Sequence, residues 1–334
     1  MSESVDTTSL NCCRICFEQD SSDNLTSPCD CRGTMHYVHA TCLSKWQRTI
    51  VLSLRGGPQQ QAQENRHRIC QACNTPFATY PKSRCDILKS VIGEELSDVS
   101  DGRLLIATKS SSERKIPATI HSVFAALLDL KRAHWRHSVY LVFSVSGEGV
   151  GDADDDTILA INLTRHMDNS TERPIPNEII LASDANDDLS IDHFNGGPVK
   201  WSVMRHGAIV INQTAEILLT ELDDFDHEYE MFVIADSGAD VDGGLEIGRC
   251  TVVGRFADIL AFARAKNVTK LKSFSGYAQW NRTQLLGEIA RGSWGLAKPD
   301  INVSDVITKE NPDELWAQLT LQSIEMKGED LLEL

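Results

Sequence analysis

CRIC at residues 13–16, CDC at 29–31, HATC at 39–42 and CQAC at 70–73 place eight potential metal ligands in the first quarter of the chain. In order, they are Cys13, Cys16, Cys29, Cys31, His39, Cys42, Cys70 and Cys73. Zinc binds four thiolate or imidazole ligands in a tetrahedron, and one tight turn between paired cysteines can supply two of them. The spacing therefore predicts two structural zinc ions in closed sites, which fold a small module rather than activate a substrate.

Cysteine use indicates a reducing compartment. Only Cys85 and Cys250 lie outside the N-terminal group of cysteines. The polar, acidic opening MSESVDTTSL is not a secretory signal. The longest apolar run, Val139 to Val145, is far shorter than the ~20 residues that span a bilayer. We expect a soluble cytoplasmic or nuclear protein without a membrane span, in which clustered cysteines bind metal.

The net charge of −16 is unevenly distributed. Residues 1–90 hold 10 basic and 8 acidic residues, a balance of +2, and the rest of the chain holds 22 and 40, a balance of −18. A chain this acidic has no general attraction for a phosphate backbone. We therefore expect no nucleic acid among its partners.

Three stretches resemble the RING-CH (RINGv) finger of one class of ubiquitin ligases: CRIC at 13–16, PCDCRGTMHYVHATCLSKW at 28–46 and CQAC at 70–73. The ligands of that family pair crosswise between two zinc ions. The resemblance implies one site made of Cys13, Cys16, His39 and Cys42. It implies a second site made of Cys29, Cys31, Cys70 and Cys73.

A PHD finger, which binds histone tails, is the alternative with the same order of ligands. It has a shorter gap before its histidine, and choosing His36 would leave five residues before Cys42 instead of two. A PHD finger usually carries a tryptophan two residues before its seventh ligand, where this chain has Arg68. The RING-CH tryptophan, four residues after the sixth ligand, is present as Trp46. These features favour RING-CH.

The RING-CH resemblance implies a ubiquitin-protein transferase that has no catalytic residues of its own. It would dock a ubiquitin-conjugating enzyme and hold the thioester-linked ubiquitin in a reactive pose toward an unknown protein substrate. The family's contact positions correspond to Ile15, Trp46 and Pro76. Asn74 stands where RING ligases often carry a basic residue, so a non-catalytic zinc-dependent interaction adaptor stays open as the alternative.

Four regions are expected along the chain. Residues 1–11 are polar and without periodicity, which predicts a disordered tail. Residues 12–80 hold the finger, in which the apolar spacing after His39 predicts a helix to about Leu54. Residues 81–101 are rich in serine and acids and are expected to be a linker, in which the apolar pattern of Ile87, Leu88, Val91 and Ile92 allows one or two helical turns. Residues 102–334 are expected to form a second domain.

Five segments of the second domain resemble the AlgH (YqgE) family: GRLLIAT at 102–108, HSVYLVF at 137–143, FNGGPV at 194–199, GYAQW at 276–280 and EIARGSW at 288–294. The resemblance implies an α+β fold with a split antiparallel sheet forming a partial barrel. The family has no agreed catalytic activity, and the sequence offers no nucleophile–base pair in this domain. We expect a binding domain that recruits the substrate.

Apolar patterns predict the elements of this domain. Strands are predicted over 140–145, 158–163, 178–181, 208–211, 217–219 and 231–234, and helices over 116–130, 255–266 and 280–291. A last helix is predicted to open at Asn311-Pro312, because asparagine caps a helix and proline suits its first position.

Overall fold

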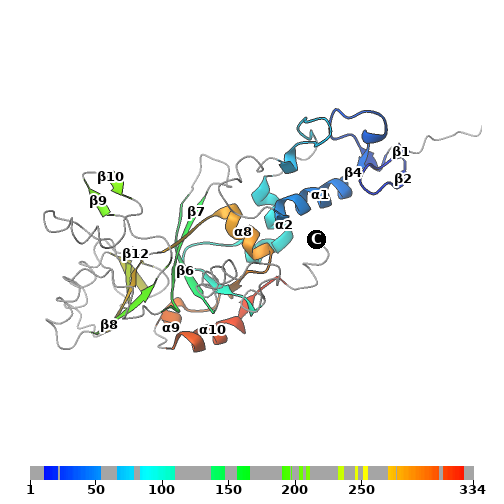
Figure 1. Cartoon of the computed structure of the whole chain (residues 1–334). Helices are drawn as coiled ribbons and strands as arrows, with labels where there is room; N and C mark the ends of the chain where they lie inside the picture. Colours follow the sequence, from blue (N-terminus) through cyan, green and yellow to red (C-terminus); the bar gives the residue numbers. More distant parts are fainter. Residues whose placement is uncertain are drawn as a thin grey trace, which may run out of the picture.

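The cysteine-rich end of the chain projects from a larger body built of two sheets (Figure 1). The structure is a computed structural model. It describes residues 11–21, 23–53, 66–78, 83–109, 137–146, 156–165, 190–195, 197, 203–205, 208–210, 232–236, 245–246, 251–254, 270–275, 277–307 and 311–326.

The N-terminal unit is made of short paired strands and one long helix. Strands β1 (Asn11–Cys12) and β2 (Gln19–Asp20) pair antiparallel, as do β3 (Leu25–Thr26) and β4 (Val38–His39). The 3-10 turns η1 (Gly33–Met35) and η2 (Arg66–Arg68) and helix α1 (Ala40–Ser53) complete the unit. The predicted helix after His39 is thus confirmed. Residues 1–10 of the expected tail lie outside the described residues, and residue 11 belongs to β1.

A six-stranded antiparallel sheet forms the middle of the molecule. Its order is β15 (Ala278–Asn281), β7 (Thr157–Asn162), β6 (Val139–Ser146), β5 (Leu104–Ala107), β16 (Trp294–Ala297) and β17 (Ser323–Ile324). Successive residues of a strand point to opposite faces. Accordingly Leu104 and Ile106 belong to one buried cluster, and Leu105 and Ala107 to the other. All four residues of β5 are apolar because both faces of the strand are covered.

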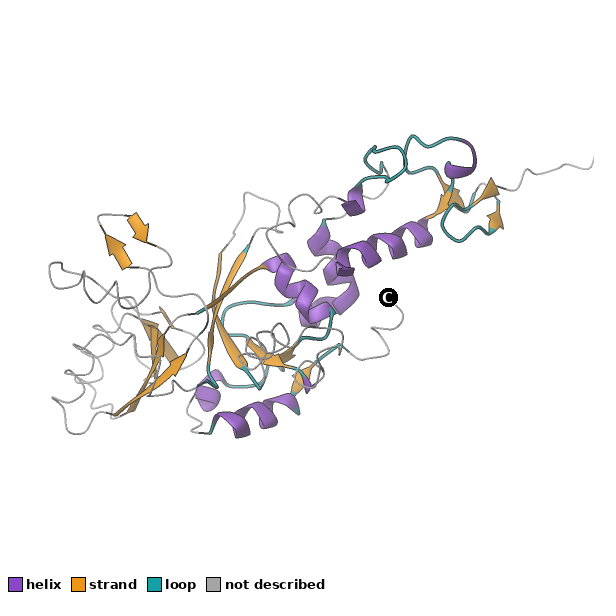
Figure 2. Cartoon of the chain, viewed as in Figure 1, coloured by secondary structure: helices purple, strands orange, loops and turns teal. Residues whose placement is uncertain are grey.

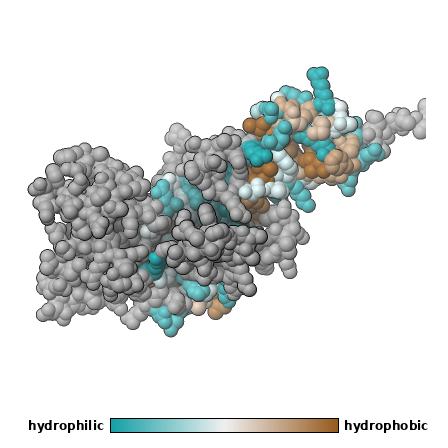
Figure 3. All heavy atoms as spheres, viewed as in Figure 1, coloured by the Kyte–Doolittle hydropathy of each residue, from teal (hydrophilic) through white to brown (hydrophobic). Residues whose placement is uncertain are grey.

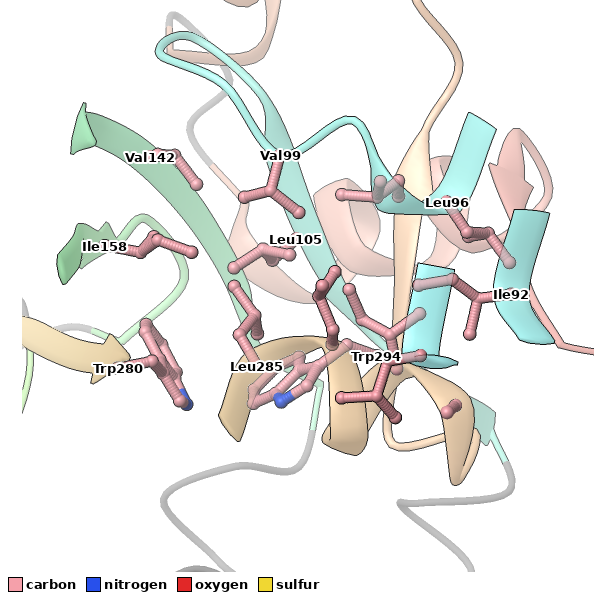
Figure 4. Packing of buried hydrophobic residues seen from close by; sticks show 14 of the residues in the cluster. Ile92, Leu96, Val99, Leu105, Val142, Ile158, Trp280, Leu285 and Trp294 are labelled. Atoms are coloured by element: carbon pink, nitrogen blue, oxygen red, sulfur yellow. The ribbon is translucent and has the colours of Figure 1, made fainter. Parts of the chain in front are cut away.

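Helices cover each face of this sheet (Figure 2). Helices α2 (Arg84–Ser97) and α8 (Arg282–Ala290) pack on one face, where Figure 4 shows Trp280, Leu285 and Trp294 in the buried cluster. Helices α9 (Val303–Ile307) and α10 (Pro312–Thr320) contribute to the cluster on the other face. The predicted helices over 280–291 and after residue 311 are both present.

The segment expected to be a linker contains helix α2. Ser83 caps it through a hydrogen bond from the backbone N–H of Asp86, 3.0 Å long. Side chains of Ile87 and Leu88 are buried in the same cluster as β5 and α8. The sequence allowed one or two helical turns here, and α2 is longer than that and packs into the core, because its apolar residues meet partners that are distant in sequence.

The second sheet has the order β12 (Leu245–Glu246), β13 (Thr251–Gly254), β11 (Phe232–Asp236), β14 (Lys270–Ser275) and β8 (Ser190–Asn195). Its pairs are antiparallel except β8 with β14, which is parallel. Strands β9 (Val203–Arg205) and β10 (Ala208–Val210) pair separately. The split sheet is therefore present, and neither part closes on itself among the strands that the structure describes.

Several predicted elements fall where the structure gives no description. The strands predicted over 178–181 and 217–219, and the helices predicted over 116–130 and 255–266, lie outside the described residues.

Two of the AlgH-like segments meet at one carboxylate. The indole N–H groups of Trp280 and Trp294 both donate to Oε2 of Glu288, over 3.2 and 2.8 Å. The rings of these tryptophans pack edge to face, with centroids 6.0 Å apart. GYAQW and EIARGSW are thus joined in the core by the hydrogen bond from Trp280 to Glu288 and by the contact between the tryptophan rings.

Candidate metal centres and partner groove

The structure brings the eight predicted ligands together as two clusters of four. The first holds Cys13, Cys16, His39 and Cys42, and the second holds Cys29, Cys31, Cys70 and Cys73. Within each cluster the ligand atoms all lie within 4.8 Å of one another. This is the crosswise arrangement that the RING-CH resemblance implies.

The distances in both clusters fit zinc. The sulfur atoms of Cys31 and Cys70 are 3.7 Å apart. Two thiolates of a tetrahedral zinc site, with Zn–S bonds of about 2.3 Å, lie about 3.8 Å apart. In the first cluster Nδ1 of His39 lies 3.3 Å from the sulfur of Cys16 and 3.7 Å from that of Cys42. The two clusters are consistent with two structural zinc ions.

His39 is oriented by a carboxylate. Its Nδ1 faces the cysteines, while Nε2 lies 3.3 Å from Oδ2 of Asp20. The other oxygen of Asp20 accepts from the amide of Asn24 at 3.0 Å and from the backbone N–H of Ser21 at 2.7 Å. The hydrogen bonds from Asn24, Ser21 and His39 lower the pKa of Asp20. An ionised partner at Nε2 leaves Nδ1 free to bind metal, which is the usual arrangement around a histidine ligand.

The thiols of the second cluster have widely separated pKa values. The hydroxyl of Thr75, 2.9 Å from the sulfur of Cys73, lowers the pKa of that thiol to about 6. Burial raises the pKa of Cys31 to about 12. A buried thiol of this kind becomes a thiolate when a bound metal ion compensates its charge.

Cys12 and His36 lie outside both clusters. The thiol of Cys12 is 3.7 Å from the carbonyl oxygen of Cys13, and Nδ1 of His36 is 2.7 Å from the carbonyl oxygen of Cys31. His36 therefore fixes the loop around a ligand instead of binding the metal.

A groove of about 180 Å³ lies beside the clusters. Of the three predicted partner contacts, Ile15 and Trp46 line it and Pro76 does not. Pro76 is exposed and pairs by a β-bridge with Ile69. The complete lining is Arg14, Ile15, Met35, Leu43, Trp46, Cys70, Gln71, Ala72 and Phe77.

The local sequence does not predict that Phe77 and Met35 line this groove. Phe77 packs edge to face on Trp46 with centroids 5.8 Å apart, and it reaches the groove from the far end of the unit. Met35 comes from the η1 turn. Both join the groove through pairings across the finger.

A larger cavity of about 380 Å³ lies far from the zinc clusters in sequence, between the end of β16 and helices α9 and α10. Its floor includes the buried side chains of Val306, Leu315 and Leu319. Lys298, Asp300 and Gln318 add polar groups to it. Its volume lies within the range of about 300–1,000 Å³ typical of ligand pockets.

Residues 126–327 match the AlgH-like family. The chain belongs to the AlgH-like family. Residues 13–73 match the RING-variant domain. A RING-CH module is therefore fused to an AlgH-like domain in this protein. Among the described residues, no helix is long and apolar enough to cross a membrane.

Relatives of each part are known. The RING-CH module is 38% identical over 72 residues to the E3 ubiquitin-protein ligase MARCHF2 of Xenopus tropicalis, covering 22% of this chain and 23% of that protein. A UPF0301 protein of Methylococcus capsulatus is 42% identical over 62 residues, covering 18% of this chain and 32% of that protein. This chain thus spans less than a third of the length of these curated relatives.

Two solved structures align with most of their length on this chain. A protein of Corynebacterium diphtheriae aligns with a TM-score of 0.39 at 15% identity, covering 68% of this chain and 93% of its own. The AlgH protein of Pseudomonas aeruginosa aligns with a TM-score of 0.33 at 19% identity, covering 65% and 84%.

Proposed function

We propose that this protein is a RING-CH ubiquitin ligase. Its zinc module docks a ubiquitin-conjugating enzyme, and its AlgH-like domain recruits the protein substrate. The observation that carries the proposal is the groove, in which Ile15 from the first ligand loop and Trp46 from α1 form apolar walls beside the metal clusters. The likeness of residues 13–73 to ligases of the MARCH type supports it.

The eight clustered residues would hold the two zinc ions, which supply structure and no Lewis-acid step. Each zinc site uses four protein ligands, so no coordination position is open for a substrate. The zinc-bound loops and α1 then keep Ile15 and Trp46 at a fixed separation. The module would act by orientation, which can lower a barrier by several kcal/mol.

In the proposed reaction the conjugating enzyme carries ubiquitin as a thioester. The amine of a substrate lysine attacks the thioester carbonyl, the new amide bond forms, and the enzyme's cysteine leaves as the thiol. The groove contributes by binding the conjugating enzyme while the AlgH-like domain holds the substrate near it. The cavity lined by Leu315 and Leu319 is the place that we propose for a substrate segment, because an apolar floor with polar groups around it suits a peptide side chain.

A ubiquitination assay tests this proposal. The full chain is mixed with ubiquitin, activating enzyme and a panel of conjugating enzymes. We expect ubiquitin chains with the unsubstituted protein and their loss after Trp46→Ala or Ile15→Ala. Leu321→Ala is the matched control, because Leu321 is an apolar residue with 79% of its surface exposed outside the RING-CH module. The proposal is contradicted if no conjugating enzyme of the panel gives ubiquitin chains, or if Trp46→Ala forms as many as the unsubstituted protein.

Substrate recruitment needs its own test with the full chain, because α2 and the end of α1 belong to the core of the AlgH-like domain. A photo-crosslinking residue at Gln318 labels proteins that enter the cavity. We expect a labelled protein to be ubiquitinated by the unsubstituted ligase and not by Trp46→Ala. Labelled proteins that are never ubiquitinated would contradict this role.

Asn74 favours a second candidate, a non-catalytic zinc adaptor. It is exposed directly after the last ligand, where RING ligases often carry a cation, and its amide can donate hydrogen bonds without a charge. Binding of a conjugating enzyme without faster discharge of its ubiquitin would support the adaptor over the ligase.

A further inference from the structure

Met35 is an exposed apolar residue in the lining of the groove beside the zinc clusters. It keeps 44% of its surface exposed and lines the groove together with Ile15 and Trp46. Figure 3 shows that hydrophobic residues reach the surface on the part of the molecule that carries the zinc clusters. The exposed surface of Met35 is continuous with the apolar residues that line the groove, and such a contiguous apolar surface is suited to contact with a partner.

The backbone of Met35 is fixed although its side chain is exposed. Gly33 opens the η1 turn with φ of +62°, and its carbonyl accepts the N–H of His36 at 3.1 Å. Nη1 of Arg14 donates to the carbonyl of Met35 at 2.9 Å. A side chain presented by such a pre-ordered turn loses little freedom on binding.

Arg14 connects this wall to both metal clusters. It lies between the ligands Cys13 and Cys16 of the first cluster, and its Nη1 is also 3.4 Å from the sulfur of Cys29 in the second. A hydrogen bond from a guanidinium to a thiolate is charge-assisted and therefore stronger than a neutral one. The metal-bound form of the second cluster thus favours the position of Arg14 that supports Met35.

We propose that Met35 is a specificity-determining contact for the conjugating enzyme and that Arg14 is its positioning residue. This inference rests on the proposed function. The occupant is an apolar side chain on an exposed loop of the conjugating enzyme. Methionine has an unbranched, polarizable side chain that adapts to irregular shapes, so we expect Met35 to set how broad a range of conjugating enzymes the groove accepts.

Binding measurements on the full zinc-loaded chain test the role of Met35. Dissociation constants are measured by calorimetry for a panel of conjugating enzymes. We expect Met35→Ala to weaken binding about five- to tenfold, the range of a significant interface contact. We expect Met35→Ile to change the order of preference among the enzymes, because a β-branched side chain is stiff. Thr34→Ala is the control, since Thr34 is exposed on the same turn and does not line the groove.

NMR spectra of the methionine methyl groups report whether the Met35 side chain changes its position or mobility. The chain has six methionines, and the signal lost in Met35→Leu identifies Met35. This signal is expected to shift when a conjugating enzyme is added. In Arg14→Lys we expect both zinc ions to be retained, the Met35 signal to broaden and binding to weaken.

The outcomes separate this inference from the proposed function. If the unsubstituted protein binds no conjugating enzyme, both are overturned. If it binds but Met35→Ala stays within twofold of Thr34→Ala for every enzyme, only the role of Met35 is overturned. If Arg14→Lys leaves the Met35 signal and the affinities unchanged, the positioning role of Arg14 is overturned.

Discussion

Phe17 and Asn74 occupy equivalent positions in the two Cys-x2-Cys turns of the zinc module. Both have left-handed backbones, with φ of 63° and 57°. The N–H of Phe17 donates to the carbonyl of Cys13 at 2.8 Å, and that of Asn74 donates to the carbonyl of Cys70 at 2.9 Å. Asparagine tolerates this conformation and a bulky aromatic residue does not. The first turn is therefore strained where the second is relaxed.

Relieving this strain should stabilise the module. Phe17 is 77% exposed, so replacing it removes little buried surface. We expect Phe17→Asn to raise the stability of the zinc-loaded protein by about 1 kcal/mol, the scale of the left-handed penalty. The thermal unfolding midpoint measures the effect. Asn74→Ala should lower the midpoint at the equivalent position, and an unchanged or lower midpoint in Phe17→Asn would refute the account of strain.

Asp20 should determine how tightly the first cluster binds zinc. Its carboxylate accepts from Nε2 of His39, and removal of such partners typically costs about 10–100-fold in metal affinity. We expect Asp20→Ala to lose affinity in this range, measured by competition with a chromophoric chelator. Asp23→Ala, at an exposed position nearby, should leave the affinity unchanged. Equal affinities in the two variants would show that Asp20 has no orienting role.

The stabilising contribution of the Asp20 carboxylate depends on its ionisation and is therefore lost at acid pH. The pKa of Asp20 is lowered in the folded state, so its contribution is complete above its ordinary pKa of about 3.9. The contribution is lost as the pH falls through the lowered folded value. In the folded protein, the Asp20 carboxyl group should titrate below its ordinary pKa, which carbon-13 NMR of that group measures. A midpoint at or above the ordinary value would contradict the ionisation assigned to Asp20.

Helix α2 should stabilise the AlgH-like core. Leu88 is fully buried among residues of β5, α8 and α2, and replacement of a buried leucine by alanine costs about 2–5 kcal/mol. We expect Leu88→Ala to lower the free energy of unfolding by that amount and Lys89→Ala, at the exposed neighbour, to have almost no effect. Urea unfolding followed by tryptophan fluorescence measures both. Similar midpoints for the two variants would mean that α2 does not belong to the core.

Glu288 should be a structural residue of the AlgH-like domain. It accepts from both Trp280 and Trp294, and hydrogen bonds to a charged group are worth about 1.5–3 kcal/mol. We expect Glu288→Leu to destabilise the domain by that amount and to change its tryptophan fluorescence. Glu288→Gln, which keeps an acceptor oxygen, should lose less. If both variants unfold at the midpoint of the unsubstituted protein, the shared carboxylate has no stabilising role.

The zinc module follows from local sequence more completely than the rest of the fold. Short steps such as Cys13 to Cys16 place two ligands in one turn, so the eight ligands are visible in the spacing, and the resemblance to the RING-CH finger supplied their crosswise division into the two clusters. The apolar pattern of Ile87 and Leu88 indicated one or two helical turns within a linker, but the full length of α2 and its place in the core were not predicted, because its apolar residues acquire their partners only in the tertiary structure.

The groove was predictable only in part, for a similar reason. Ile15 and Trp46 sit beside ligands whose order is fixed by the sequence. Met35 and Phe77 reach the groove through the pairing of distant segments. Pro76 lies beside Phe77 but outside the groove lining, because successive residues of an extended segment point to opposite sides.

The two units also share structure that the sequence does not reveal. Val51 near the end of α1 is fully buried in the same cluster as Leu88 and Leu285. Nη1 of Arg291 in the AlgH-like domain donates to the carbonyl of Leu52 at 3.5 Å. Helix α1 therefore runs from the groove, at Trp46, into the AlgH-like core, and the position of the groove relative to that domain is set by one helix.

The most direct measurement of the ligase proposal is a single-turnover discharge. A conjugating enzyme charged with ubiquitin is mixed with free lysine and the full zinc-loaded chain, and the loss of the thioester is followed in time. The ligase account predicts faster discharge with the unsubstituted protein and with Leu321→Ala, and the uncatalysed rate with Trp46→Ala. Discharge at the uncatalysed rate with the unsubstituted protein, by an enzyme that binds it, would contradict the account.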